Sequence, residues 1–210
     1  TPQPNAQYVR RNLLGHLGVG ASVRMHSDRD SAVGDANDLA ARIEARRGAA
    51  PYIIPFGGTT PMSTVGLVSG GLEIAGQVAR GEMLAPDVVY VALGSMGTAV
   101  GVTLGMALGG LFPTVRAITV VPATIATEQG FRGLLNAVAD LLHEADASIP
   151  ADLAARVHVE VVGGFFGEGY ALFTPAGMEA VHLAAALGDL LDSPARRADQ
   201  GLEAGAVSWS

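Results

Sequence analysis

The sequence VVYVALGSMGTAVG, residues 88–101, decides the fold that we expect for this chain of 210 residues. Its first half is a continuous apolar run, which is typical of a strand in a parallel sheet covered by helices on both faces. Residues 94–98 predict a sharp turn, and the small residues at 98–111 predict a helix that begins at once. A strand, a turn and a helix in this order direct backbone N–H groups and a helix dipole at one point, where phosphate binds readily.

The turn supplies the candidate binding residues Gly94, Ser95, Met96, Gly97 and Thr98. The two glycines let the backbone turn and approach an anion closely, and the serine and threonine hydroxyls can add hydrogen bonds. The same residues also suit a tight connection between a strand and a helix with no ligand. From these residues by themselves, both interpretations stay open.

Three better-known motifs are excluded at this turn. A dinucleotide-binding loop needs glycines at G-x-G-x-x-G, whereas the spacing here is G-x-x-G-x-x-x-G. A mononucleotide P-loop needs a lysine, and a nucleophile elbow needs a glycine where Leu93 stands. Ser95 is therefore predicted to bind phosphate rather than to act as a nucleophile.

The rest of the chain alternates between predicted strands and predicted helices. We expect strands at 21–25, 51–55, 87–93, 114–121 and 157–162, and helices at 5–18, 35–47, 98–111, 125–144 and 174–191, with a further helix ending near residue 80. Asp35 or Asn37 could cap the second helix, and Thr174 the last. The alternation predicts an α/β protein with a doubly wound parallel sheet. A proline and two glycines at 55–58 predict a domain boundary.

The composition excludes several classes of function. The net charge is −7 and the arginines are scattered, so we expect no binding to nucleic acid. There is no cysteine for a disulfide or a thiolate metal site, and the five histidines lack metal-binding spacing. A polar start and glycine-broken apolar stretches predict no signal peptide, no membrane span and a cytoplasmic protein. All 13 basic side chains are arginine, so no lysine amine is available.

Two further motifs, together with the turn, resemble segments of a known protein family. PYIIPFGGTTPMSTVGLVSGGLEIAGQ, residues 51–77, and GEGYALFTPAGMEAVHLAA, residues 167–185, flank it on either side. The three motifs, in this order and spacing, resemble the D-cysteine desulfhydrase / 1-aminocyclopropane-1-carboxylate deaminase family. The likeness extends over about residues 8–192. It implies a tryptophan synthase β-like fold of pyridoxal-phosphate enzymes (fold type II), incomplete at both ends.

The resemblance also implies a function and roles for residues. It implies a pyridoxal-phosphate-dependent lyase or deaminase that acts on a small amino acid, in which residues 1–56 are the remnant of a small domain and residues 57–210 the large cofactor-binding domain. Residues 94–98 take the positions of the loop that holds the cofactor phosphate. Tyr170 takes the position of a tyrosine near substrate and cofactor and is the catalytic candidate. A core tyrosine at the sheet edge is the alternative for Tyr170.

This sequence departs from the family pattern at several positions, and these departures support an alternative function. The family's cofactor lysine and its following Ser-Asn-His motif are absent from this chain, as is the Thr-Gly-Gly that meets the pyridine nitrogen, and Met96 replaces a small residue. The phosphate anchor is thus retained while the covalent lysine is missing. A homodimer or a complementing chain could complete the site. The alternative is a degenerate, non-catalytic module that binds a phosphate ligand or a partner.

Overall fold

The computed structural model describes residues 7–169 and 172–191. The chain divides into two compact units, Thr1–Pro55 and Phe56–Ser210. The division falls within the predicted boundary region, whereas the assignment of the units to a small domain and a cofactor domain stays a prediction. In the parts of the chain that are described, the helices are too short or too polar to span a bilayer.

The second unit contains a three-stranded parallel sheet in the order β1-β2-β3. Its elements are the 3₁₀ turn η1 (Phe56–Gly58), the helices α3 (Pro61–Ala79), α4 (Gly97–Leu108), α5 (Glu128–Ala145), α6 (Leu153–Arg156) and α7 (Pro175–Leu191), and the strands β1 (Val88–Leu93), β2 (Thr114–Thr119) and β3 (His158–Val162). The α/β class, the parallel sheet and these three predicted strands are confirmed. Because all three strands run in one direction, the loops that follow them leave the same edge of the sheet.

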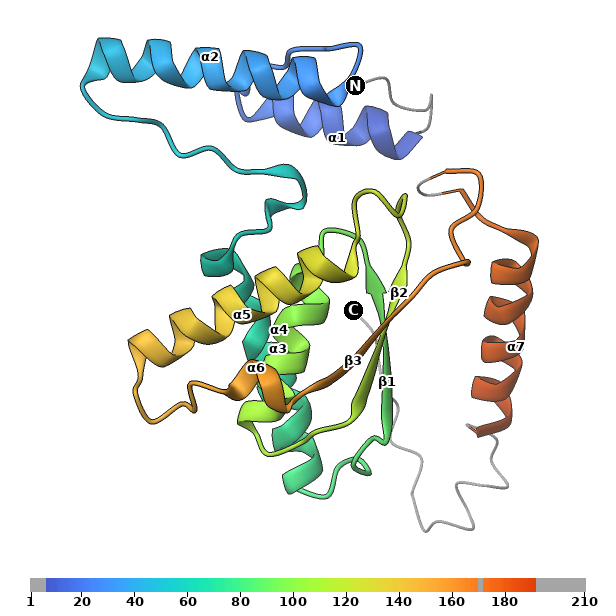
Figure 1. Cartoon of the computed structure of the whole chain (residues 1–210). Coiled ribbons are helices and arrows are strands. Elements are labelled where there is room, and N and C mark those ends of the chain that lie inside the picture. The colour runs from blue at the N-terminus through green and yellow to red at the C-terminus, as the bar shows by residue number, and fades with distance from the viewer. Residues whose placement is uncertain (1–6, 170–171, 192–210) are drawn as a thin grey trace. The chain divides into compact units, whose positions relative to one another are not determined.

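One face of the sheet carries the hydrophobic core. Helices α3, α4 and α5 lie on this side (Figure 1), and α4 contacts both β1 and β2. The fully buried core residues are Leu93, Val100, Leu104, Met106, Ala117, Phe131 and Val138. Burial of these side chains is the main stabilising contribution to this unit.

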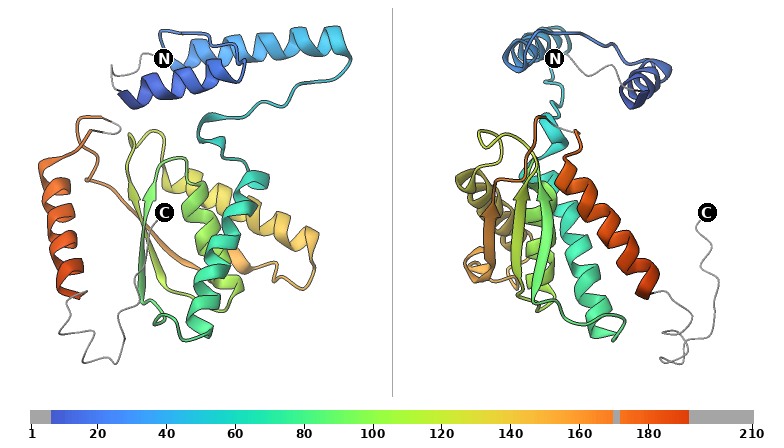
Figure 2. Two further views of the ribbon diagram at one scale, coloured as in Figure 1. Left: turned by 180° about the vertical axis from the view of Figure 1, so that it is seen from behind. Right: turned by 90° about the vertical axis from the view of Figure 1, so that its right-hand side faces the viewer.

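The described residues leave the other face of the sheet largely uncovered, which corrects one expectation. The apolar run of β1 predicted a strand covered on both faces, but exposure alternates along β1, and the Tyr90 side chain is 64% exposed. Across this face, Arg116 of β2 donates to Tyr90 of β1 and pairs with Glu160 of β3. Helix α7 lies on this side of the sheet in Figures 1 and 2, with its described residues 175–187 all exposed.

The helix ends in the second unit follow from their capping residues. Thr60 begins α3 in a capping box with Ser63, and Thr127 caps α5 by accepting from the Gly130 N–H. The predicted cap at Thr174 is confirmed, because its hydroxyl accepts from the Gly177 N–H and Pro175 opens α7.

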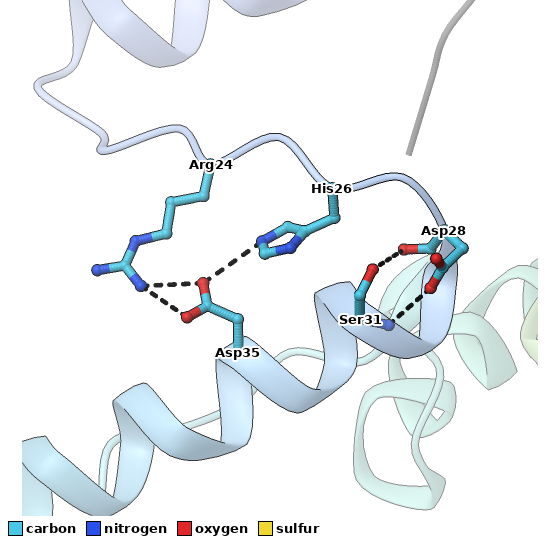
Figure 3. A network of polar contacts seen from close by, with 5 residues as sticks. All are labelled: Arg24, His26, Asp28, Ser31 and Asp35. Carbon is cyan, nitrogen blue, oxygen red and sulfur yellow. Dashed lines mark hydrogen bonds and ion pairs between the residues drawn. The ribbon is translucent and has the colours of Figure 1, made fainter.

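The first unit consists of two helices, α1 (Gln7–Gly18) and α2 (Arg29–Arg47). The predicted start of α2 near residue 35 is wrong. Asp28 accepts from the Ser31 N–H at 2.8 Å and begins the helix earlier (Figure 3). Asp35 instead lies inside α2, where it binds Arg24 through both carboxylate oxygens at 2.9 Å and lies 3.4 Å from His26. The Arg24 guanidinium holds the pKa of the Asp35 carboxyl below its usual value.

The two strands predicted in the first unit are wrong. Residues 21–25 and 51–55 have strand-like composition but form no strand, and no described residue of this unit is buried. A strand is stabilised by hydrogen bonds to a neighbouring strand, and within the described part of this unit no such neighbour is available. The apolar side chains of these segments therefore remain exposed, with Tyr52 at 76% and Ile54 at 72%.

Candidate functional site

The turn between β1 and α4 ends in a helix start without a side-chain cap. Met96 occupies the N-cap position in the left-handed region, with φ 72° and ψ −25°, and makes no capping hydrogen bond. The starts of α2, α3 and α5 are each capped by a side chain, from Asp28, Thr60 and Thr127 respectively. The first N–H groups of a helix have no partner within it. At α4 no N-cap side chain accepts from these donors, and the dipole of a helix favours an anion at such an end.

Helices α3 and α4 bring two N-termini to the same place. The helices run parallel, because Gly101 and Gly105 of α4 and its C-cap residue Gly109 approach Leu67, Val68 and Ala75 of α3 in that order. A Cβ added at Gly105 would lie 2.0 Å from the Val68 carbonyl oxygen, so the backbones are in direct contact. Two helix starts therefore lie side by side at the edge of the sheet where β1 ends, and both contribute positive potential.

The residues before α3 contact the turn before α4. The Thr59 hydroxyl donates to the Ser95 hydroxyl oxygen at 2.8 Å, although the two residues are 36 positions apart. Gly57, with φ 71°, lies so close to Ser95 that an added Cβ would be 2.4 Å from the Ser95 Cβ. The missing side chain of Gly97 faces Thr59 and Thr64. The segments 57–59 and 94–98 thus form one continuous structure.

The five predicted binding residues of the turn have different surroundings from one another. Ser95 and Thr98 are exposed, whereas Gly97 is buried against the start of α3. Gly94 lies beside the residues that follow β2, and the Met96 side chain packs against the hydrophobic core next to Gly130. The side chain of Met96, which replaces a smaller residue of the family pattern, is thus accommodated, partly buried, at the edge of the core.

Tyr170, the catalytic candidate, lies outside the described residues. Residues 163–169 follow β3 and leave the sheet at the same edge as the turn before α4. The role of Tyr170 near the site stays a prediction.

Thr59 contacts the candidate site through Ser95, although the sequence around Thr59 did not predict a role for it. The local signal around Thr59 is the turn composition of GGTT, residues 57–60, before a helix. Such a turn is common at helix starts, so it does not distinguish a binding residue from a structural one.

The donors of this site fit a phosphate and do not fit the covalent attachment of pyridoxal phosphate. The segments GGT (57–59) and GSMGT (94–98) offer N–H groups and hydroxyls, and neither contains a carboxylate that would repel an anion. The sequence offers no lysine for the cofactor aldehyde. Within the described residues, no group of histidine, aspartate and glutamate side chains could hold a metal ion.

Comparison with known proteins identifies relatives of this chain. D-cysteine desulfhydrase of Salmonella paratyphi C (strain RKS4594) is 40% identical over 155 residues, which cover 73% of this chain and 44% of that protein. D-cysteine desulfhydrase of Salmonella schwarzengrund (strain CVM19633) is 39% identical over the same length. The chain thus spans less than half the length of the curated relatives that it matches. No family model matches the sequence.

A solved structure described as an ACC deaminase homologue shares the fold. It aligns with a TM-score of 0.53 at 23% identity, over 83% of this chain and 50% of its own. The parallel sheet, the covering helices and this likeness define an α/β protein with the fold of the type-II pyridoxal-phosphate enzymes, present in part. Over the part that it covers, the chain belongs to the D-cysteine desulfhydrase / 1-aminocyclopropane-1-carboxylate deaminase family.

Proposed function

We propose that this chain supplies the phosphate-anchoring part of a pyridoxal-phosphate-dependent lyase or deaminase that acts on a small amino acid. The observation that carries the proposal is the uncapped start of α4 at Met96, beside the hydroxyls of Ser95 and Thr98. The relatives named D-cysteine desulfhydrase support the class of reaction. In the proposed division, residues 57–210 form the cofactor domain and residues 1–56 belong to a small domain.

Each residue of the proposed site has a role that follows from its chemistry. The N–H groups of residues 95–98 bind phosphate oxygens, and the Ser95 and Thr98 hydroxyls donate further hydrogen bonds. When bound, pyridoxal phosphate supplies the electron sink for carbanion chemistry at the substrate. Tyr170 faces substrate and cofactor in this proposal. The protein thereby fixes the cofactor's position through its phosphate, which is the part of the task that these residues can perform.

The absence of lysine favours a second candidate function. A chain with an anion site and no side-chain amine could be a non-catalytic module that binds a phosphate ligand or a partner chain. The lyase and the form of the module that binds a phosphate ligand predict phosphate binding at the same residues, whereas a module that binds only a partner chain does not. The two candidates differ in whether this part of the fold supports turnover once a cofactor lysine is supplied.

The first experiment measures binding of pyridoxal 5′-phosphate, pyridoxal and inorganic phosphate to the full chain by calorimetric titration. We expect both phosphate-bearing ligands to bind and pyridoxal to bind at least about tenfold more weakly, because charge-assisted hydrogen bonds contribute about 1.5–3 kcal/mol. Ser95→Ala should weaken phosphate binding about fivefold. Borohydride should fix no pyridoxyl group on a side chain, and dialysis should remove the ligand. Equal affinity for pyridoxal and its phosphate would refute the site.

A further inference from the structure

We infer that Thr59 is a positioning residue for the anion site, which it serves by directing the Ser95 hydroxyl toward the ligand. The inference rests on the proposed phosphate site and adds a residue outside the β1–α4 turn. Its basis is the contact between the segment before α3 and the turn before α4.

The direction of the Thr59–Ser95 hydrogen bond decides where the Ser95 proton can go. Thr59 has one hydroxyl proton, and its oxygen lies 2.8 Å from the Ser95 oxygen but 3.4 Å from the Gly57 carbonyl oxygen. The shorter distance is the normal length for a hydroxyl–hydroxyl bond, whereas the longer one is outside it. The Gly57 carbonyl oxygen is thus too far away to take the Thr59 proton, which stays available to Ser95. When a ligand accepts the Ser95 proton, Thr59 donates to the Ser95 oxygen in turn.

The surroundings of Ser95 determine which group accepts the hydrogen bond from its hydroxyl. Ser95 is exposed and directly precedes the uncapped start of α4, where an anion is favoured. A hydroxyl that accepts one hydrogen bond becomes a better donor in the next, because successive hydrogen bonds polarise each other. Thr59 thus strengthens the bond from Ser95 to a phosphate oxygen without contacting the ligand.

The packing around Ser95 restricts the orientation of its hydroxyl group. Gly57 closes one side of Ser95 so tightly that an added Cβ would also lie 2.6 Å from the Ser95 hydroxyl oxygen. Thr59 is held between this turn and Gly97, whose missing Cβ would be 3.2 Å from the Thr59 oxygen. Ser95 has little freedom to rotate between these neighbours, so its hydroxyl is oriented before the ligand arrives.

The test is a double-mutant cycle on the affinity of the full chain for pyridoxal 5′-phosphate and for inorganic phosphate. Thr59→Val keeps the shape of the side chain and removes its hydroxyl, and we expect affinity to fall about fivefold. Thr59→Ser restores the hydroxyl and should bind within about twofold of the unsubstituted chain. In a chain that already carries Ser95→Ala, adding Thr59→Val should change affinity by less than about twofold, because Thr59 acts only through Ser95.

The neighbouring threonine provides a matched control. The Thr60 hydroxyl caps α3 by accepting from the Ser63 N–H and bonds to Ser63 rather than to Ser95. Thr60→Val should therefore lower the thermal midpoint and leave phosphate affinity unchanged. Gly57→Ala offers a second route, since it displaces Ser95 while keeping both hydroxyls, and it should also weaken binding.

The outcomes separate the inference from the proposal beneath it. If the unsubstituted chain binds no phosphate-bearing ligand, the proposed site fails. If it binds but Thr59→Val binds equally well, or if Thr59→Val weakens binding just as much in the Ser95→Ala chain, the positioning role is overturned while the site stands. Loss of affinity in Thr60→Val equal to that in Thr59→Val would also overturn it, because a general effect on α3 would then explain both.

Discussion

At the scale of single residues, Met96 shows how strain and packing are balanced at the site. Among the described residues, it is the only one other than glycine with a left-handed backbone. That conformation costs an ordinary residue about 1–2 kcal/mol. The Met96 side chain packs against the hydrophobic core next to Gly130, and this burial offsets the cost. The strained residue stands where the β1–α4 turn presents its N–H groups, as strained positions at binding sites often do.

Asp28 gives a prediction for pH dependence at the residue scale. Hydrogen bonds from Ser27 and Ser31 lower the pKa of the Asp28 carboxyl from 3.8 to about 2. A carboxyl whose pKa is depressed in the folded state stabilises that state above pH 3.8, and the contribution is lost as the pH falls toward 2. We therefore expect the Ser31 amide resonance to titrate with a midpoint near pH 2 in an NMR experiment.

The matched variant for this titration is Asp28→Asn. Asparagine keeps an oxygen that can accept from the Ser31 N–H but does not titrate, so the Ser31 resonance should be insensitive to pH in this range. A midpoint at 3.8 or above in the unsubstituted chain would show that Asp28 does not cap α2 in solution.

At the scale of elements, the pair α3–α4 depends on glycines at the helix contact. A Cβ at Gly71 would lie 2.3 Å from the Val102 carbonyl oxygen and 2.6 Å from the Met106 nitrogen, both of them backbone atoms that cannot rotate away. At the adjacent Gly70, the nearest atom to an added Cβ is a Val102 methyl at 3.9 Å, which is an ordinary contact. Two neighbouring glycines of one helix therefore face very different surroundings.

This contrast predicts opposite outcomes for two adjacent alanine substitutions. Gly71→Ala forces the helices apart and should lower the free energy of unfolding by about 3 kcal/mol or more. Gly70→Ala should leave it unchanged or raise it by up to about 1 kcal/mol, because alanine favours the helix over glycine. Urea unfolding followed by circular dichroism measures both. Equal stability of the two variants would mean that α3 and α4 are not packed backbone to backbone.

The capping pattern also belongs to the scale of elements. Local sequence decides the starts of α3, α5 and α7, where a threonine side chain accepts from the first turn. Helix α4 follows a different rule, because its start is determined by the tight turn from β1 and lacks a side-chain acceptor. The proposed anion would take the place of the missing cap.

At the scale of the whole molecule, the two units differ in how many of their described residues are buried. The second unit has a contiguous core around Phe131 and Leu104, whereas no described residue of the first unit is buried. Apolar side chains such as Leu14, at 68%, and Met25, at 65%, are exposed on the helices α1 and α2 and on the segments 21–25 and 51–55. Because hydrophobic burial is the main term in stability, the second unit is the more stable of the two.

The match to relatives more than twice the aligned length suggests a functional test at this scale. We propose to replace the matching part of Salmonella D-cysteine desulfhydrase with the 155 aligned residues of this chain and to measure sulfide release from D-cysteine. If this part of the fold supports the reaction, the chimera should turn over. Ser95→Ala in the chimera should raise the cofactor concentration for half-maximal activity about fivefold.

The control and the contrary result distinguish the two candidate functions. Thr60→Val in the chimera should lower its thermal midpoint and leave the cofactor requirement unchanged. A folded chimera that binds pyridoxal phosphate with normal affinity but releases no sulfide would favour the non-catalytic binding module over the lyase.

The sequence by itself determined the elements whose causes are local. The apolar run at 88–93, the glycine turn and the small residues after it predicted β1, the turn and α4, and the boundaries of β2, β3, α5 and α7 were predicted within a few residues. The assignment of phosphate binding to residues 94–98 also came from the sequence and stays a prediction, as does the role of Tyr170. These predictions succeed or stand because strand composition, helix periodicity and capping act over a few neighbouring residues.

Only the tertiary structure decided the features that depend on distant parts of the chain. Residues 21–25 and 51–55 have the composition of strands, but a strand forms only where another strand accepts its hydrogen bonds, and the described structure gives them none. The open sheet face at Tyr90 depends on which helices cover it, not on the apolar sequence of β1. The contact between Thr59 and Ser95 joins residues 36 positions apart, because the glycine-lined packing of α3 on α4 brings both helix starts to one edge of the sheet.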